Sequence, residues 1–305
     1  MLRPVPGFRD AVLRALPSGT PQEDWTDAAY AETAARRVDA ARRRLRVLGE
    51  PPQRALEIGC GAGLDCLVAA LEGVPSVLGI DRDPPMLATR DDRRAQRARR
   101  LLAAVMAIYG RKGDPAVVLE RSGVDIRVMD ATQLALPGAS VDAVWSRTAL
   151  EHIRPIESAL GEVARVLRPG GVAHHLIDPF FWLKGCHARG LTDLPWAHAR
   201  LDLEDYERFV RRAESRRRAA RRTDWLRTLN RLRPADWRRM FEADSRFELL
   251  AVQERTSPVA EAMLARHNEV LDTALPGISE RDLTCCAVEV VLRRRSDIQE
   301  SSVRA

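Results

Sequence analysis

Short apolar runs rich in β-branched residues alternate with amphipathic stretches along the middle of the chain. The apolar runs have the length of single strands, and the stretches between them, near 64–73, 84–109 and 156–167, show helical spacing. This alternation predicts βαβ units in a parallel sheet that helices cover on both faces. The five predicted strands are Arg54–Ile58, Ser76–Ile80, Asp125–Met129, Asp142–Trp145 and Val172–Ile177.

The segments on either side of this region have different patterns. Residues 22–48 predict one or two helices, and residues 180–240 are helical and arginine-rich with no strand pattern. Two further predicted strands, Phe247–Val252 and Thr284–Leu292, flank a helix at 258–273, and the last ten residues have the composition of a frayed tail. No low-complexity linker isolates 180–240, so we interpret it as an insertion into the fold.

A glycine-rich loop lies directly between the first predicted strand and the following helix. Residues 55–63 read Ala-Leu-Glu-Ile-Gly-Cys-Gly-Ala-Gly. Glycines let the backbone turn sharply and approach a ligand, while the helix N-terminus offers unpaired amides. A dinucleotide fingerprint requires G-x-G-x-x-G, but the third glycine here, Gly63, comes one residue early and Leu64 takes its place. The loop therefore predicts a nucleotide-type pocket without a pyrophosphate.

Four further features follow this loop in order. The second and third strands end at Asp81 and Asp130, the fourth runs on to Glu151-His152, and residues 165–171 read Arg-Val-Leu-Arg-Pro-Gly-Gly. Together with E-x-G-x-G-x-G, they resemble the class I S-adenosylmethionine-dependent methyltransferases, in particular those acting on small molecules in quinone and natural-product biosynthesis. The resemblance extends over about 125 residues, a length that makes a chance match of a short motif improbable.

The resemblance implies an α/β fold with a doubly wound, Rossmann-like, seven-stranded sheet, mostly parallel with an antiparallel last strand. The domains would be an N-terminal helical lid (1–50), a cofactor-binding core (51–179), a helical insertion for the acceptor (180–245), and the last two strands and helix of the core (246–295). The cofactor would be S-adenosyl-L-methionine, with S-adenosyl-L-homocysteine as product. The residues implied to contact it are Glu57, Gly59, Gly61, Asp81, Arg82, Asp130, Ala131 and Ser146. Taken singly, such residues also serve tight turns and helix caps.

Candidates for the acceptor site come from the segments that follow the fourth and fifth strands. His152 is the leading general base, because a neutral imidazole can take a proton from a phenol, alcohol or ammonium. A histidine bonded to backbone at a helix start is an equally good interpretation. Strand alternation lets only one of His174 and His175 face the pocket, and His175 is taken as the substrate-side candidate. Phe181 and Trp182 are expected to form an apolar wall.

Two other kinds of chemistry are not favoured by the sequence. The E-x-x-E-H pattern by which small-RNA 2′-O-methyltransferases of this fold bind magnesium is incomplete, because Thr148 stands three residues before Glu151. We therefore predict no metal. The N/D-P-P-Y/F tetrapeptide of the enzymes that methylate exocyclic base amines is also absent after the fourth strand, where residues 146–149 read Ser-Arg-Thr-Ala.

Composition adds limits on partners and location. The chain has 305 residues, 45% hydrophobic and 30% charged, with a net charge of +6, and no apolar run approaches the about 18 residues of a membrane span. With no apolar leader and no CxxC pair among five cysteines, we expect a cytoplasmic protein without membrane contact. The segment between Asp205 and Met240 contains thirteen arginines and five acidic residues. A solvated helical face is favoured there over a docking surface.

We therefore expect an O- or N-methyltransferase of a small metabolite, with nucleic acid not favoured as a partner and a homodimer left open. Two alternatives remain. The arginine-rich helices could serve an RNA or carrier-bound substrate, and strong salt dependence of binding would indicate this. The protein could also bind the cofactor without transferring methyl, or use the sulfonium electrostatically in a cyclisation or decarboxylation, because a fold does not determine a reaction.

Overall fold

The computed structural model describes residues 2–17, 25–49, 51–87 and 92–296. These residues form one seven-stranded sheet in the order β3-β2-β1-β4-β5-β7-β6. Neighbouring strands are parallel from β3 to β5, and β7 runs antiparallel to both β5 and β6. The predicted fold class, a mostly parallel sheet with an antiparallel last strand, is confirmed. The strands are β1 Arg54–Ile58, β2 Ser76–Asp81, β3 Val124–Val128, β4 Val141–Arg147, β5 Leu167–Ile177, β6 Phe247–Thr256 and β7 Cys285–Arg294.

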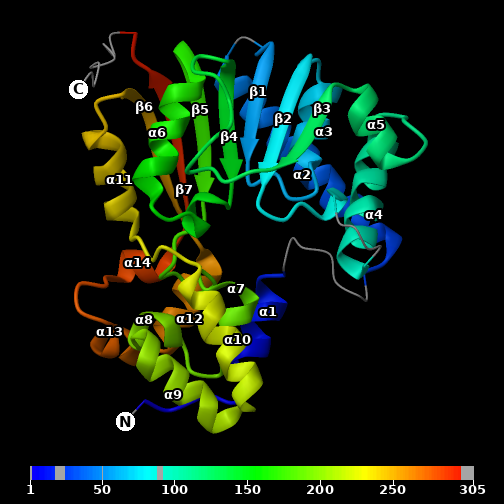
Figure 1. Ribbon diagram of the computed structural model, residues 1–305. Coiled ribbons are helices and arrows are strands. Elements are labelled where there is room, and N and C mark those ends of the chain that lie inside the picture. The colour runs from blue at the N-terminus through cyan, green and yellow to red at the C-terminus, as the bar shows by residue number, and fades with distance from the viewer. Residues whose placement is uncertain (1, 18–24, 50, 88–91, 297–305) are drawn as a thin grey trace.

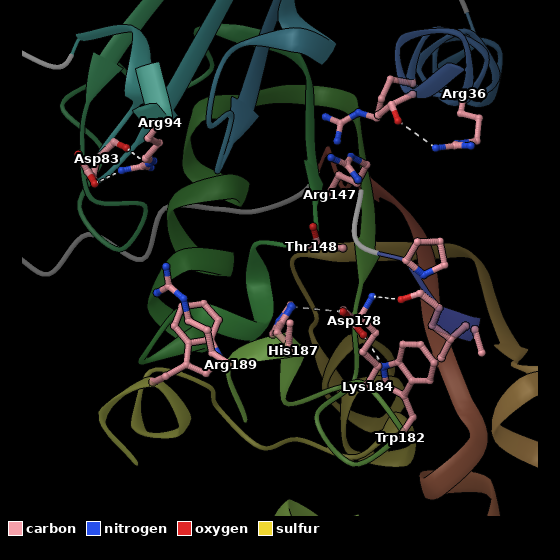
Figure 2. Close-up of a pocket in the computed structure, with 17 residues that line it drawn as sticks. Arg36, Asp83, Arg94, Arg147, Thr148, Asp178, Trp182, Lys184, His187 and Arg189 are labelled. Atoms are coloured by element: carbon pink, nitrogen blue, oxygen red, sulfur yellow. Dashed lines mark hydrogen bonds and ion pairs between the residues drawn. The ribbon is translucent and has the colours of Figure 1, made fainter. Parts of the chain in front are cut away.

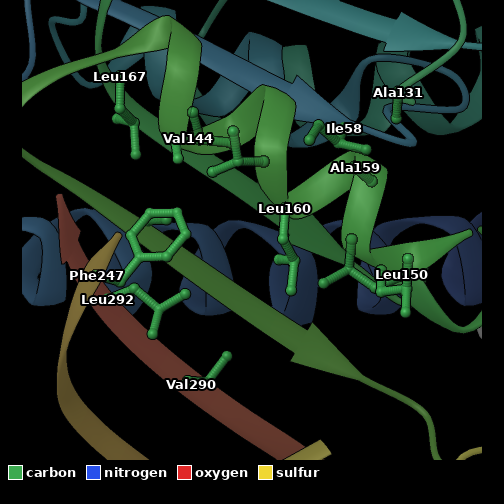
Figure 3. Close-up of a cluster of buried hydrophobic side chains, with 14 of the residues drawn as sticks. Ile58, Ala131, Val144, Leu150, Ala159, Leu160, Leu167, Phe247, Val290 and Leu292 are labelled. Carbon is green, nitrogen blue, oxygen red and sulfur yellow. The ribbon is translucent and has the colours of Figure 1, made fainter. Parts of the chain in front are cut away.

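Helices cover both faces of this sheet, as the βαβ pattern requires. On one face, α6 and α11 bury Leu160 and Trp237 in a cluster that includes Val144 and Phe247 of the sheet (Figure 3). On the other face, α2, α3 and α4 pack together against β1 and β2, with α5 beside β3. The helices are α2 Asp27–Leu48, α3 Leu64–Leu71, α4 Arg93–Ile108, α5 Pro115–Arg121, α6 Ile156–Val166 and α11 Pro234–Ala243.

A separate group of short helices lies beyond the carboxyl ends of the parallel strands (Figure 1). We call it the helical cap. Its apolar centre includes Phe8 of α1, Trp196 and Tyr206 from the segment after β5, and Leu264 from the segment between β6 and β7. The cap consists of α1 Phe8–Ala15, α7 His187–Gly190, α8 Ala197–Arg200, α9 Leu203–Ala213, α10 Arg216–Arg227, α12 Pro258–Arg266, α13 Glu269–Thr273 and α14 Glu280–Thr284.

Packing therefore divides the chain differently from the boundaries expected at 50, 180 and 245. The N-terminal segment splits, since α1 joins the cap while α2 packs on α3 and α4 of the core. Residues 18–24 and 50 of the expected lid lie outside the described residues. Helix α11 joins the core, whereas α12 to α14 join the cap. Apolar spacing marks these helices in the sequence but does not say which neighbours they pack against.

Local signals explain where several elements begin. Thr26 and Asp92 cap α2 and α4, each by accepting a backbone N–H three residues on. The predicted helix at 84–109 is interrupted, with a short 3₁₀ turn, η1 Pro85–Leu87, before α4, and residues 88–91 lie outside the description. None of the described helices combines the length and apolar character that crossing a membrane would require.

Candidate functional site

The loop after β1 packs so tightly that glycine is required at two positions. Gly59 has φ +71°, and a Cβ there would lie 2.4 Å from Cβ of Ala149, in the segment after β4. Gly63, the N-cap of α3, has φ +77°, and its Cβ would lie 2.5 Å from Cδ1 of Ile126. Any other residue would combine a left-handed backbone with a steric clash. The glycines thus let the loop pack directly against the segment after β4 and against β3.

Two carboxylates are fixed at the same edge of the sheet. Oδ2 of Asp81, the last residue of β2, accepts the Gly61 N–H at 3.0 Å, and Oδ1 accepts the Asp83 N–H at 2.9 Å. Oδ1 of Asp130, beyond β3, accepts the backbone N–H of Thr132 at 2.8 Å and its hydroxyl at 2.7 Å. These hydrogen bonds lower the pKa of Asp130. The edge therefore presents oriented carboxylates that can accept further hydrogen bonds.

These groups line a cavity of about 520 Å³, which we call the cofactor cavity. Its volume suits a ligand of nucleoside size. Of the residues predicted to bind the cofactor or act in catalysis, it brings together Gly59, Asp81, Arg82, Asp130, Ala131 and His152. The carboxylates at Asp81 and Asp130 fit the hydroxyl and amine donors of an adenosine.

Three predicted cofactor residues lie elsewhere. Glu57 is 2% exposed and accepts a hydrogen bond from the Cys66 thiol at 2.9 Å, so it faces the interior of the core. Ser146 is fully buried and hydrogen-bonds Nδ1 of His175 at 2.8 Å. Gly61 does not line the cavity, although its N–H orients Asp81. Neither Glu57 nor Ser146 lines the cofactor cavity, because both side chains are buried in the core, and their contact with the cofactor stays a prediction.

A larger cavity of about 1100 Å³ lies between the core and the cap, and we call it the acceptor cavity. It shares Arg94, Thr148 and Trp225 with the cofactor cavity, so the two adjoin. Figure 2 shows Arg36 and Arg147 on one side of it and Lys184 and His187 on the other. Its lining residues are Ala15, Leu16, Pro17, Thr33, Arg36, Arg37, Asp83, Arg94, Arg147, Thr148, Asp178, Trp182, Lys184, His187, Ala188, Arg189 and Trp225.

Of the three predicted substrate residues, only Trp182 lines this cavity, where its indole N–H donates to Oδ1 of Asp178. Phe181 packs edge-on against Phe180 in the centre of the cap. His175 is fully buried beside Ser146 between β4 and β7. Neither Phe181 nor His175 lines the acceptor cavity, and the substrate roles expected for them stay predictions. Alternation along β5 did select one histidine for each face, but both faces are covered by packed elements.

His152 lies where the two cavities meet. Its ring stacks on that of His187, with centroids 5.2 Å apart, and lies 5.3 Å from the ring of Trp225. Burial lowers the pKa of His152 to about 4, a shift that the charge of Asp81 partly opposes. The imidazole is thus neutral at pH 7, with a free lone pair, and is a weaker base than an exposed histidine.

Glu151 lies beside this ring pair, buried and without a hydrogen-bond partner in the described chain for either carboxylate oxygen. Burial raises its pKa well above the usual range, and the charge of Asp178 raises it further. Side-chain ligand atoms of Glu151, His152 and His187 all lie within 4.8 Å of one another. This set of donors could hold a divalent cation or receive polar groups of a ligand.

Sequence reasoning missed most of the acceptor cavity. Asp178 could have been predicted from the sequence, because it directly follows β5, at the same edge of the sheet where Asp81 ends β2. Arg147 ends β4 and was available to the same rule. No local signal marks His187 or Trp225, which come from cap helices and reach the cavity only through tertiary packing.

Comparisons with known proteins agree with this geometry. Residues 56–174 match the family described as methyltransferase domain. The 27-O-demethylrifamycin SV methyltransferase of Amycolatopsis mediterranei is 32% identical over 130 residues, which cover 41% of this chain and 40% of that protein. The demethylmenaquinone methyltransferase of Thermus thermophilus is 33% identical over 128 residues, covering 41% and 46%. The chain thus spans less than half the length of these relatives.

Among solved structures, an S-adenosylmethionine-dependent methyltransferase from Mesorhizobium loti aligns with 84% of this chain and 96% of its own. The TM-score is 0.46 and the sequence identity 20%. The family match covers the glycine loop, both edge carboxylates, and the strands up to His174 of β5.

Proposed function

The chain carries a class I S-adenosylmethionine-dependent methyltransferase domain, and on this premise we propose that it methylates an oxygen or nitrogen atom of a small metabolite. The observation that carries the proposal is the junction of the two cavities at Thr148 and Trp225, with the His152 ring beside it. A cofactor-sized space and an acceptor-sized space that open into each other allow two bound molecules to meet.

Residues of the cofactor cavity would hold S-adenosylmethionine as follows. The Asp81 carboxylate is placed to accept hydrogen bonds from ribose hydroxyls, and Asp130 to accept from the adenine amine. Gly59 lets the loop after β1 lie directly against Ala149 at the wall of the cavity. When bound, the cofactor supplies a methyl group on a sulfonium, whose leaving group is a neutral thioether.

The acceptor would enter from the cap side. Trp182 and Trp225 offer apolar surface on one part of the cavity wall, while charged groups line the rest. The names of the two relatives refer to a rifamycin and a demethylmenaquinone, both small molecules, which supports a small acceptor and a role in metabolite or natural-product biosynthesis. The five cysteines are free thiols, which fits the reducing cytoplasm.

His152 is the proposed general base. As a neutral imidazole at the junction of the cavities, it can remove the proton of an acceptor hydroxyl or ammonium as the new bond to the methyl carbon forms. Glu151 lines neither cavity, but its unpartnered oxygens lie next to the imidazole and would position the His152 ring. The cap contributes by excluding water from the junction.

We propose that this transfer uses no metal ion, although Glu151, His152 and His187 could group around one. Burial, together with neighbouring groups that include Lys184 and Arg189, lowers the pKa of His187 to about 3. The positive charges of Lys184 and Arg189 also disfavour a divalent cation at this position. Dialysis against EDTA should leave methyl transfer unchanged. A loss of activity that Mg²⁺, Mn²⁺ or Zn²⁺ restores would assign these three residues to a metal instead.

The arginine-rich helices do not call for an RNA partner. Seven of the arginines between residues 205 and 240 form ion pairs with acids of the same molecule, which leaves less charge for phosphates. These arginines are Arg208, Arg211, Arg222, Arg227, Arg233, Arg238 and Arg239.

The proposal is tested by S-adenosylmethionine with a labelled methyl group. The protein is incubated with it and with an extract of host cells that has been separated by size, with and without ribonuclease. Label in the small-molecule fraction, lost in Asp81→Ala, supports the proposal. Ribonuclease-sensitive label in the large fraction would replace it with an RNA methyltransferase. Cofactor binding without label in any fraction would favour a protein that binds the cofactor and does not transfer methyl.

A further inference from the structure

The acceptor cavity is lined by more positive than negative side chains. Among the described residues, six cations line it, from both the core and the cap, against two acids, Asp83 and Asp178. Even with Glu32 and Asp65, which lie outside the lining and pair with some of these arginines, the cations remain in excess. The six are Arg36, Arg37, Arg94, Arg147, Lys184 and Arg189.

Two of these six cations, Arg37 and Arg147, lie around one buried carboxylate, together with Arg44 behind them. Asp65 is 1% exposed and is shared by Arg37 at 2.8 Å, Arg44 at 2.9 Å and Arg147 at 3.5 Å. The neighbouring acid, Glu57, does not compensate, because burial raises its pKa to about 8 and keeps it neutral at pH 7. Three guanidinium groups therefore share a single negative charge.

Arg147 is the member of this group that faces the reaction site. It is the last residue of β4 and directly precedes Thr148, where the two cavities meet. Its contact with Asp65 is the longest of the three, and its Nε is buried without a hydrogen-bond partner among the described residues. In Figure 2 its guanidinium lies at the cavity, above Thr148. It is thus a cation of the acceptor cavity whose one ion pair among the described residues, with Asp65, is long, and it adjoins Thr148 in the chain.

The opposite wall adds positive charge rather than removing it. The Lys184 ammonium donates to the backbone oxygen of Leu16 at 2.6 Å, and the Arg189 guanidinium lies 4.7 Å from the centroid of the Trp225 ring. Burial raises the pKa of Asp178, the acid on this wall, to about 7, so it is only partly ionised at neutral pH.

We propose that the acceptor carries an anionic group, a carboxylate or a phosphate, that pairs with Arg147 and remains charged after methyl transfer. The inference rests on the proposed function and names the substrate class of the same site. A guanidinium binds either anion through two parallel N–H donors, and water exclusion by the cap strengthens the interaction. The anion would also neutralise the excess charge that otherwise lies unpaired in the cavity.

S-adenosylmethionine has a carboxylate of its own, and that carboxylate could pair with one of the cations of the acceptor cavity. The test therefore measures anion binding on protein saturated with S-adenosylhomocysteine. Inorganic phosphate and succinate are the probes, one for each source of negative charge, and isothermal titration calorimetry measures their affinity. At least one probe should bind with and without S-adenosylhomocysteine. Binding of both only in its absence would mean that the cavity serves the cofactor's carboxylate, and would overturn the inference.

Substitutions then locate the anion. Arg147→Met should weaken probe binding about 10-fold or more, because the charged donors are lost. Arg208→Met is the matched control, an exposed arginine paired with Asp205 outside the cavity, and should change nothing. Arg147→Lys retains the charge without the fork and should weaken binding only a few-fold. If Arg147→Met does not fold, Arg147→Lys still tests the inference. Wild-type affinity in both Arg147 variants would overturn the inference.

The labelled product separates this inference from the proposed function. If the acceptor is anionic, the labelled small molecule binds an anion-exchange resin at pH 7. A labelled product that flows through would overturn the anionic acceptor and leave the methyltransferase standing. A protein that does not bind S-adenosylhomocysteine would refute the proposed function and, with it, this inference.

Discussion

Gly59→Ala is a direct test of how closely the glycine loop packs against the segment after β4. The added Cβ would lie 2.4 Å from Cβ of Ala149, whereas two carbon atoms are comfortable at about 3.5–4.0 Å. Either the loop or Ala149 must therefore move by more than an ångström. Both residues line the cofactor cavity, so the movement falls on the binding site.

The expected cost has two parts. An alanine at φ +71° costs about 1–2 kcal/mol of backbone strain, and the overpacking costs about 1–3 kcal/mol more. The free energy of unfolding should thus fall by about 2–5 kcal/mol. Gly61→Ala is the matched control, because Gly61 has φ +53° but nothing within 4 Å of an added Cβ. Its free energy of unfolding should fall only by the cost of the backbone strain. The difference in stability between the two variants therefore measures the cost of the clash with Ala149.

Urea denaturation followed by circular dichroism measures both variants, and calorimetry measures their affinity for S-adenosylhomocysteine. Gly59→Ala should be less stable than Gly61→Ala by about 1–3 kcal/mol and bind about 10-fold more weakly than wild type. Equal stability and equal affinity of the two variants would refute the reasoning, since it would mean that Ala149 does not confine the loop.

The remaining predictions concern charged groups. Asp81→Asn should weaken S-adenosylhomocysteine binding about 10- to 100-fold and Asp130→Asn about 2- to 10-fold, because hydrogen bonds to a charged acceptor are lost; calorimetry showing wild-type affinity in both would remove them from the site. Asp65→Asn should lower the free energy of unfolding by about 3–5 kcal/mol, because buried Arg44 loses its partner. A loss below about 1 kcal/mol in urea would contradict this. The His152 imidazole should gain a proton only as the pH falls through about 4, so its Cε1–H NMR signal, assigned with His152→Gln, should stay constant from pH 5 to 8. A midpoint near the ordinary value of about 6.5 would contradict the buried position.

The cofactor cavity was largely predictable from the sequence because its residues follow strand ends. Gly59, Asp81 and Asp130 each lie at the end of a strand or within two residues of it, and the carboxyl ends of parallel strands meet at one edge. Glu57 and Ser146 lie within strands, so their positions depend on which face is covered. Both faces are covered here, by packed helices, and this cannot be read from strand alternation.

The acceptor cavity was predictable only in small part. Its walls come from α1, α2, the ends of β4 and β5, and cap helices that are distant in sequence, and Trp182 alone was anticipated. Trp225 has the apolar spacing of a helix-packing residue, and the same spacing equally suits a residue at a cavity. The excess of arginine visible in the sequence lies at 205–240, whereas the cations of the cavity are dispersed from Arg36 to Arg189.

A crystal structure of the protein with S-adenosylhomocysteine tests the central claim most directly. We predict that the ligand occupies the cofactor cavity, with its ribose hydroxyls on Asp81, its adenine beside Asp130 and its sulfur directed toward the junction at His152. A ligand bound in the acceptor cavity, or one whose sulfur points away from His152, would contradict the account.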